Sequence, residues 1–336
     1  MGCRGPSPDG ERRESQGDRR TGDGPGRQPR AGSSAAGRAL AFQAECREFE
    51  SRLPLRYPFQ GLIRSHPTVS YGGSTEDTDL DLRLRGYTAL VAGSTSGLGA
   101  AVAAALSTEG ANVVIGGRRK TLAEELASTL PSAIGLALDM ADPTSIEGAV
   151  ATAEHAFGEI DIVVLNTGGP PPAAAAGLSE TMLTSGLETL LLMQIHLVTR
   201  VLPGMRSRRW GRVLAIGSSG VQEPLADLAI SNVARGALAA YLKTLSAEVA
   251  ADGVTVNMVL PGRIDTERVT ALDRLRAERQ GIDVEAARRQ SEEAIPAGRY
   301  GTPAEFGAVA CFLCSGQASY VTGAQLRVDG GLARGF

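Results

Sequence analysis

The chain has 336 residues, of which 43% are hydrophobic and only 4% aromatic, and its formal net charge is −3. This length allows one large or two small domains, with enough aliphatic side chains for a sizeable core. The charge gives no reason to expect a nucleic acid or an anionic membrane as partner, and no apolar run reaches the roughly 18 residues of a membrane helix.

The first 81 residues differ in composition from the rest. Residues 1–38 are dominated by Gly, Arg, Pro, Ser and Asp, and such a segment cannot offset the entropy lost on ordering. Residues 40–63 allow a short helix near 45–53, and residues 64–81 are again polar. Acidic residues interleave with the arginines, which disfavours nucleic-acid binding. We expect residues 1–81 to be a largely disordered extension and residues 82–336 to form the domain.

From Leu84 onward, apolar runs alternate with helix-forming runs. The predicted helices cover residues 99–109, 121–130, 144–157, a long stretch ending near 205, 231–250 and 304–313. The predicted strands cover residues 88–92, 112–115, 133–138, 160–165, 212–216, 254–260 and 325–328. Apolar strands that alternate with helices indicate a doubly wound parallel sheet covered on both faces, in a single α/β domain.

A glycine-rich turn lies between the first strand and the first helix. Glycines let the backbone turn tightly and approach a pyrophosphate, and the free N–H groups of the new helix attract its charge. The spacing is Gly-x-x-x-Gly-x-Gly rather than the commoner Gly-x-Gly-x-x-Gly, and taken alone the turn could be a plain strand-to-helix connection. The candidate dinucleotide-binding residues here are Gly93, Ser94, Thr95, Ser96, Gly97, Leu98 and Gly99.

The residues after the second strand bear on the choice of cofactor. An acidic residue there would bind the ribose 2′-hydroxyl of NAD, whereas a basic one suits the 2′-phosphate of NADP. This chain has Arg118 and Arg119, whose forked cations match a phosphate. A solvated basic turn is the alternative. We predict NADP (NADPH) as cofactor, with NAD less favoured.

Further motifs follow in order, and the chain resembles the short-chain dehydrogenase/reductase family over essentially all of residues 84–336. The motifs are Leu138-Asp139-Met140, Leu165-Asn166-Thr167-Gly168, the Pro-Gly segment from Val256 to Thr266, and C-terminal segments at 299–305, 320–323 and 328–331. The C-terminal segments are similar to those of the 3-oxoacyl-carrier-protein reductase-like branch. The resemblance implies a Rossmann-like fold, reduction of a carbonyl substrate, and a homodimer or homotetramer formed through helices 182–205 and 231–250.

The resemblance also implies cofactor contacts. Asp139 would contact adenine, with a helix N-cap role as the alternative. Asn166 lies where ligands of open α/β sheets bind. Thr266 could donate a hydrogen bond to the nicotinamide carboxamide, or its role could be purely local, within the Pro-Gly turn. The candidate cofactor residues in these motifs are Asp139, Met140, Asn166, Gly168, Pro261, Gly262, Ile264 and Thr266.

The chain departs from the family at the catalytic positions. Ser218 fits the position of the family's catalytic serine. The family has a tyrosine 13 residues later and a lysine four residues after that, but this chain has Ser231 and Arg235 at those positions. A tyrosine hydroxyl has an ordinary pKa of about 10, and an aliphatic hydroxyl is a far poorer acid. Tyr241 lies ten residues beyond Ser231, about 15 Å along a helix. The family's structural Asn falls near Leu190 or Leu191 and is also missing.

Three interpretations remain open. In the first, the chain reduces a 3-oxoacyl thioester or related ketone: Ser218 and Ser231 polarise the carbonyl, water relays the proton, and Arg235 orients the cofactor and stabilises the oxyanion. In the second, it binds NADP without catalysis, as a sensor or structural partner. In the third, the fold serves a lyase or isomerase reaction. We expect the substrate wall to come from residues 169–172 and from 267–295, as an amphipathic lid or an ordinary surface helix pair.

The remaining cysteines and histidines indicate no other chemistry. Cys311 and Cys314 form a C-x-x-C inside an apolar run, so we interpret them as a buried helix face rather than a redox pair. His66, His155 and His196 have no metal-ligand spacing, and a catalytic role for His196 is a minor alternative. No signal segment precedes the domain, and we expect a cytoplasmic protein without a metal.

Overall fold

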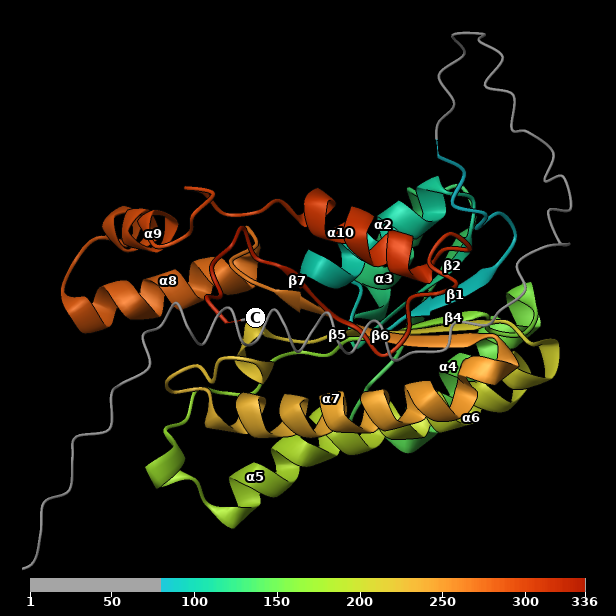
Figure 1. Ribbon diagram of the computed structural model, residues 1–336, viewed down its shortest axis with the longest axis horizontal. Coiled ribbons are helices and arrows are strands. Elements are labelled where there is room, and N and C mark those ends of the chain that lie inside the picture. Colours follow the sequence, from blue (N-terminus) through green and yellow to red (C-terminus); the bar gives the residue numbers. More distant parts are fainter. Residues whose placement is uncertain (1–79, 336) are drawn as a thin grey trace, which may run out of the picture. The chain divides into compact units, whose positions relative to one another are not determined.

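The structure is a computed structural model, and it describes residues 80–335 (Figure 1). The predicted disordered extension therefore lies, except for its last two residues, outside the described part. Leu80 is exposed, whereas Leu84 is fully buried. Among the described residues, the buried core includes Leu84 and the strands and helices that follow it.

The centre of the fold is a single seven-stranded parallel sheet, with the strand order β3-β2-β1-β4-β5-β6-β7. All seven predicted strands are present, and the Rossmann-like fold class is confirmed. Because the chain runs outward from β1 in one direction and then returns to place β4 on its other side, the order reverses between β1 and β4. Such a reversal leaves a crevice at the carboxyl ends of the strands. The strands are β1 (Thr88–Val91), β2 (Asn112–Gly117), β3 (Ala133–Ala137), β4 (Ile162–Leu165), β5 (Gly211–Ile216), β6 (Val254–Pro261) and β7 (Gln325–Val328).

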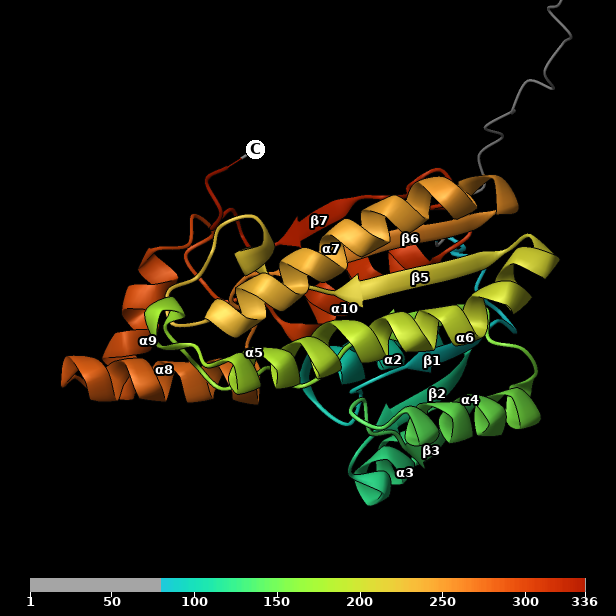
Figure 2. The same ribbon diagram turned by 90° about the horizontal axis from the view of Figure 1, so that it is seen from below.

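Helices cover both faces of the sheet (Figures 1 and 2). Alternate strand residues point to opposite faces, so Ala89 and Ile162 pack with one helical layer while Leu90 and Val163 pack with the other. Burial on both sides explains why the strands are continuous apolar runs. The first layer contains α2 (Gly97–Thr108), α3 (Lys120–Ser128) and α10 (Pro303–Cys314), and the second contains α4 (Pro143–Phe157), α6 (Met193–Arg208) and α7 (Ala229–Val249).

Helix α10 confirms the interpretation of the two cysteines. Thr302 caps the helix through a reciprocal capping box with Glu305, so it begins at Pro303. Cys311 and Cys314 are buried against the sheet with the other apolar residues of α10. Burial raises the pKa of the Cys311 thiol to about 12 and that of Cys314 further still. Thiols held neutral in this way are core side chains, not reactive ones.

The long helix expected to end near residue 205 is three segments. These are α5 (Glu180–Leu187), the π-helical η2 (Glu188–Leu192) and α6. Leu190, one of the two positions near which the structural Asn was expected, is buried against Ile230 and Ala234 of α7. Within the described residues, the stretch Glu180–Arg208 is long and apolar enough to span a membrane by length and composition alone. In this fold, its α6 part packs on the sheet.

The last two helices, α8 (Glu267–Gln280) and α9 (Val284–Glu293), are together called the lid here. Both lie at the end of the domain toward which the arrowheads of β5 and β7 point (Figure 2). The lid therefore stands beyond the carboxyl ends of the strands. The remaining short helical turns are η1 (Ala175–Gly177), η3 (Ser219–Val221) and η4 (Ala250–Asp252).

Candidate functional site

A cavity of about 1000 Å³ opens at the carboxyl ends of the central strands. Its floor comes from the segments that follow β1, β4, β5 and β6, one wall from α7 and the other from the lid. The predicted site residues that line it are Gly93, Ser96, Gly97, Leu98, Asn166, Gly168, Ser218, Ser231, Arg235, Pro261, Gly262, Ile264 and Thr266. Residues far apart in the sequence therefore meet in one place, and it is the crevice expected of this topology.

The glycine turn has the geometry of a phosphate cradle. Gly93 and Gly97 have φ of +58° and +60°, which favours glycine at both positions. A Cβ on Gly99 would lie 2.4 Å from the carbonyl oxygen of Gly93, so the first turn of α2 packs directly on the strand end. The N-cap residue Ser96 makes no side-chain cap hydrogen bond, and the first turn contains no acidic residue. The first N–H groups of α2 are therefore left for an anion.

Two predicted cofactor residues hold this turn together from inside. Ser94 is fully buried, and its hydroxyl donates to the carbonyl of Val91 at 2.6 Å and accepts from the N–H of Gly116 at 3.1 Å. The Nδ2 amide of Asn166 donates to the carbonyl of Gly93 at 2.9 Å. The side chain of Ser94 points into the protein, so only its backbone position shapes the cradle.

The two arginines after β2 lie beside the cradle. The Nη2 of Arg119 donates to the hydroxyls of Thr95 and Ser96 at 3.0 and 3.2 Å. Arg118 and Arg119 are both exposed, and neither forms an ion pair with any residue between 80 and 335. Two unneutralised guanidinium groups at the edge of a phosphate cradle fit a further phosphate.

Asp139 and Met140, which were expected near the adenine, and Thr266 of the Pro-Gly segment differ in how far their side chains are available to a cofactor. Asp139 accepts from the N–H of Ala141 at 3.0 Å, and Asp142 rather than Asp139 caps α4, so the alternative role for Asp139 does not apply. Met140 is 5% exposed and packs in the core, which leaves only its backbone for a cofactor. Thr266 caps α8 and lies opposite Gly97, with its methyl carbon 3.8 Å from a Cβ built there.

The three candidate catalytic residues share the cavity. The Oγ of Ser218 accepts from the N–H of Gly220 at 3.1 Å, which leaves its own O–H free to donate. Ser231 and Arg235 lie one turn apart on α7 and are 6% and 7% exposed. Arg235 donates from Nη1 to the carbonyl of Ile216, at the end of β5, at 2.7 Å.

Arg235 is a buried cation without a carboxylate partner in the described chain. Burial, together with the smaller effect of the nearby positive charge of Arg268, lowers its pKa to about 10. The group remains protonated at neutral pH. Because Arg235 is buried, water screens its charge only weakly, and the charge interacts strongly with an oxyanion that forms beside it.

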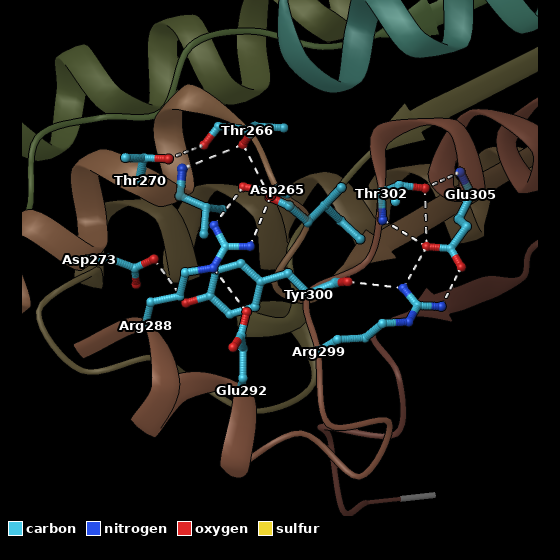
Figure 3. A network of polar contacts seen from close by, with 12 residues as sticks. Asp265, Thr266, Thr270, Asp273, Arg288, Glu292, Arg299, Tyr300, Thr302 and Glu305 are labelled. Atoms are coloured by element: carbon cyan, nitrogen blue, oxygen red, sulfur yellow. Dashed lines mark hydrogen bonds and ion pairs between the residues drawn. The ribbon is translucent and has the colours of Figure 1, made fainter. Parts of the chain in front are cut away.

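A polar network fixes the base of the lid (Figure 3). Arg288 of α9 pairs with Asp265, which precedes α8, at 2.9 Å, and its guanidinium lies over the ring of Tyr300, 4.6 Å from the centroid. The Tyr300 hydroxyl donates to the buried carboxylate of Asp273 at 2.9 Å. The Arg288 hydrogen bond holds the pKa of Asp265 below its ordinary value, and burial raises the pKa of Tyr300. These contacts join α8, α9 and the segment before α10.

Sequence reasoning missed the lid arginines that face the cavity. The guanidinium of Arg268 lies against Gly169, where a Cβ would approach its Nη2 to 1.9 Å. The helical spacing of Arg268, Leu272 and Arg276 on one face was the available signal. Pro172 also lines the cavity, as expected, whereas His196 and Tyr241 are not among its lining residues. His196 instead lies 3.0 Å from Glu147 of α4. No cluster of three potential metal ligands occurs within residues 80–335.

Comparison with known proteins agrees with this arrangement. Residues 92–333 match a family profile described as enoyl-(acyl carrier protein) reductase. The chain is 34% identical over 254 residues to D-beta-hydroxybutyrate dehydrogenase of Cupriavidus necator, which covers 74% of this chain and 98% of the relative. The chain belongs to the short-chain dehydrogenase/reductase family. The 3-oxoacyl-(acyl-carrier-protein) reductase of Vibrio cholerae is 32% identical over 252 residues, or 75% of this chain and 99% of the relative. The predicted likeness to that branch is thereby confirmed.

Solved structures give the same result. L-Sorbose reductase of Gluconobacter frateurii, complexed with NADPH and L-sorbose, superposes with a TM-score of 0.72 at 29% identity, covering 76% of this chain and 100% of that one. A variant of actinorhodin polyketide ketoreductase with NADPH gives a TM-score of 0.71 at 29% identity, covering 74% and 98%. The fold and family of these reductases are therefore those of this chain.

Proposed function

We propose that this chain is an NADPH-dependent oxidoreductase that reduces a carbonyl group, in a 3-oxoacyl thioester or a related ketone, with an atypical catalytic site. The observation that carries the proposal is that Ser218, Ser231 and Arg235 line the same cavity as the glycine turn. The relatives named above are reductases and dehydrogenases, and two structural neighbours contain NADPH.

The residues of the cavity fit NADPH. The N–H groups at the start of α2 would hold the pyrophosphate, and Arg118 and Arg119 the 2′-phosphate. Asp139 would contact the adenine. Asn166, Gly168 and the segment from Pro261 to Thr266, with Gly262 and Ile264, would surround the nicotinamide half. NADPH would supply the hydride.

The chain's own residues would handle the charge and the proton. Ser218 and Ser231 donate hydrogen bonds to the substrate carbonyl and hold it in place. Arg235, cationic and fixed by Ile216, stabilises the negative charge that develops on the carbonyl oxygen. A serine hydroxyl is too weak an acid to give up its proton easily, so the proton comes from water in the open cavity.

Substitutions on α7 test this proposal with a matched control. Ser231→Ala should lower NADPH-dependent turnover of β-ketoacyl thioesters, ketones or quinones, while Ser246→Ala, which alters a buried serine of the same helix outside the cavity, should not. Arg235→Gln should lower kcat by about 100- to 1000-fold because it removes the charge that faces the oxyanion. Equal activity in Ser231→Ala and Ser246→Ala would refute the serine's role.

The loss of the family's acid favours a second candidate, an NADP-binding sensor or structural partner without catalysis. NADPH binding measured by fluorescence, together with no turnover on any of these substrates, would select it. Ser231→Tyr combined with Arg235→Lys separates the cases further. A large gain in ketone reduction would show that only the acid was lost, and no gain would show that the pocket serves another task.

The assembly and the cellular setting belong to the same proposal. A homodimer or homotetramer would form through α5–α6 and α7, where Leu192 and Val233 expose 52% and 47% of their surface. Exposed apolar side chains on long helices are typical of a subunit interface. Sedimentation at several protein concentrations would test this, and a monomer throughout would contradict it. We also propose a cytoplasmic location and a dispensable extension before the domain.

A further inference from the structure

The cavity has an excess of positive charge. Five arginines line it, Arg235, Arg263, Arg268, Arg276 and Arg279, against two acidic residues, Asp227 and Glu267. Two of the arginines are neutralised by ion pairs: Arg279 with Asp227 at 2.8 Å, and Arg263 with the buried Asp273 at 3.2 Å. The other three have no carboxylate within 4 Å among residues 80–335. A cleft lined by charges of one sign raises the local concentration of ligands with the opposite charge.

The three unneutralised arginines occupy different parts of the cavity. Arg235 is held at the end of β5. Arg268 follows two residues after Thr266, which lies opposite Gly97 of the glycine turn, so both arginines belong to the cofactor half. Arg276 lies eight residues beyond Arg268 on α8, which is about 12 Å further along the helix axis. It therefore lies toward the substrate end of the lid.

The surroundings of Arg276 leave most of its hydrogen-bonding groups available. Its Nη1 donates to the hydroxyl of Ser291 on α9 at 2.8 Å, and that hydroxyl donates in turn to the carbonyl of Ala287 at 3.0 Å. A guanidinium has five N–H donors in a rigid fork. This single neutral bond orients the side chain along the cavity wall without neutralising it.

We propose that the substrate carries an anionic group, a carboxylate or a phosphate monoester, and that Arg276 binds it at the end of the cavity away from the cofactor. This inference rests on the proposed function for the identity of the reacting carbonyl. Two oxygens of a carboxylate or of a phosphate accept parallel hydrogen bonds from a guanidinium fork, which fixes the substrate's direction as well as its affinity. Arg276 thus determines specificity without touching the reacting atoms.

Ligand binding tests the inference apart from turnover. The probes are a series of oxo acids with a terminal carboxylate, together with their methyl esters. A 3-oxoacyl phosphopantetheine and its dephosphorylated form are compared in parallel to distinguish the two sources of anion. Each is titrated by calorimetry into wild type, Arg276→Gln, Arg276→Lys and Arg274→Gln with NADPH present. Arg274 is an exposed residue of the same helix outside the cavity, so its variant is the matched control.

We expect one of the two anions to bind wild type more tightly than its neutral partner. Arg276→Gln should lose roughly 10- to 100-fold in affinity for that anion, with Arg276→Lys in between. The neutral compounds and NADPH should bind all variants alike. Equal binding of anionic and neutral probes to wild type, or equal losses in Arg276→Gln and Arg274→Gln, would overturn the inference. Anion binding without turnover would refute the proposed reductase activity but not the anion site. Failure to bind NADPH would refute only the proposed cofactor.

Discussion

Replacing Gly99 by alanine should damage the cofactor site more than the fold. A Cβ at this position would lie 2.4 Å from the Gly93 carbonyl oxygen, 2.9 Å from Asn166 Nδ2 and 2.9 Å from the Cα of Ser94. Ordinary contact begins near 3.4 Å, so α2 and the turn must separate by about 1 Å. Two of these neighbours are backbone, and the Asn166 amide is tied to Gly93 by the 2.9 Å bond, so none can rotate away.

The magnitude follows from two opposing effects. Overpacking costs about 1–3 kcal/mol, and alanine returns about 1 kcal/mol of helix propensity, which leaves a net destabilisation of about 0–2 kcal/mol. Moving the α2 N–H groups away from the pyrophosphate costs at least one charge-assisted hydrogen bond, about 1.5–3 kcal/mol. NADPH affinity should therefore fall roughly 10- to 100-fold.

Gly148→Ala is the matched control for this substitution. Gly148 lies inside α4, and a Cβ there meets nothing within 4 Å. It should gain about 0.5–1 kcal/mol of stability and bind NADPH as wild type does. Urea unfolding and fluorescence titration measure both quantities. If Gly99→Ala bound NADPH within about twofold of wild type, the reasoning about the cradle would be wrong.

Three other predictions concern the rim and the lid. Arg119→Ala should weaken NADPH at least tenfold and leave NADH unchanged, because only NADPH has the 2′-phosphate; equal losses in fluorescence titrations would contradict this. Tyr300→Phe should cost about 1–3 kcal/mol in urea unfolding, since the buried Asp273 loses its hydroxyl donor; an unchanged midpoint would count against that bond. Hydrogen bonds from the Arg299 guanidinium and, to a smaller extent, from Thr302 lower the pKa of Glu305 from 4.5 to about 2. The contribution of the ionised Glu305 to the stability of the folded state is therefore fully present above pH 4.5 and is lost as the pH falls toward 2. Thermal unfolding of Glu305→Gln should show a flatter decline over that window, and a parallel decline would refute the linkage.

The strands and the glycine turn could be predicted because local sequence determines them. A run such as Val113–Ile115 is apolar at every position, which is required only where both faces of a strand are buried. Gly93 and Gly97 could be identified as special because positive φ and close backbone contact both favour glycine. The family's ordered motifs then located the remaining segments of the cavity floor.

The direction of individual side chains could not be predicted in the same way. Ser94 and Ser96 are two residues apart in one turn. The Ser94 side chain is nevertheless buried and hydrogen-bonded to the Val91 carbonyl, whereas Ser96 lines the cavity. Arg276 could be predicted as a lid residue, but its exposure to the cavity depends on how α8 packs against α9. The π-helical segment around Leu190 likewise depends on tertiary contacts with α7 rather than on local propensity.

The middle and the end of α8 are held by contacts of different kinds, and this bears on how fast ligands exchange. The middle of the helix is joined to Tyr300 and Arg263 through the carboxylate of Asp273, which is buried. Near the end of the helix, Arg279 reaches Asp227 through side chains that are 60% and 48% exposed. An exposed ion pair contributes only about 0–1 kcal/mol, so breaking it slows entry by a factor of about five at most. Ligand association should therefore remain fast, and differences in affinity among substrates should appear as differences in residence time.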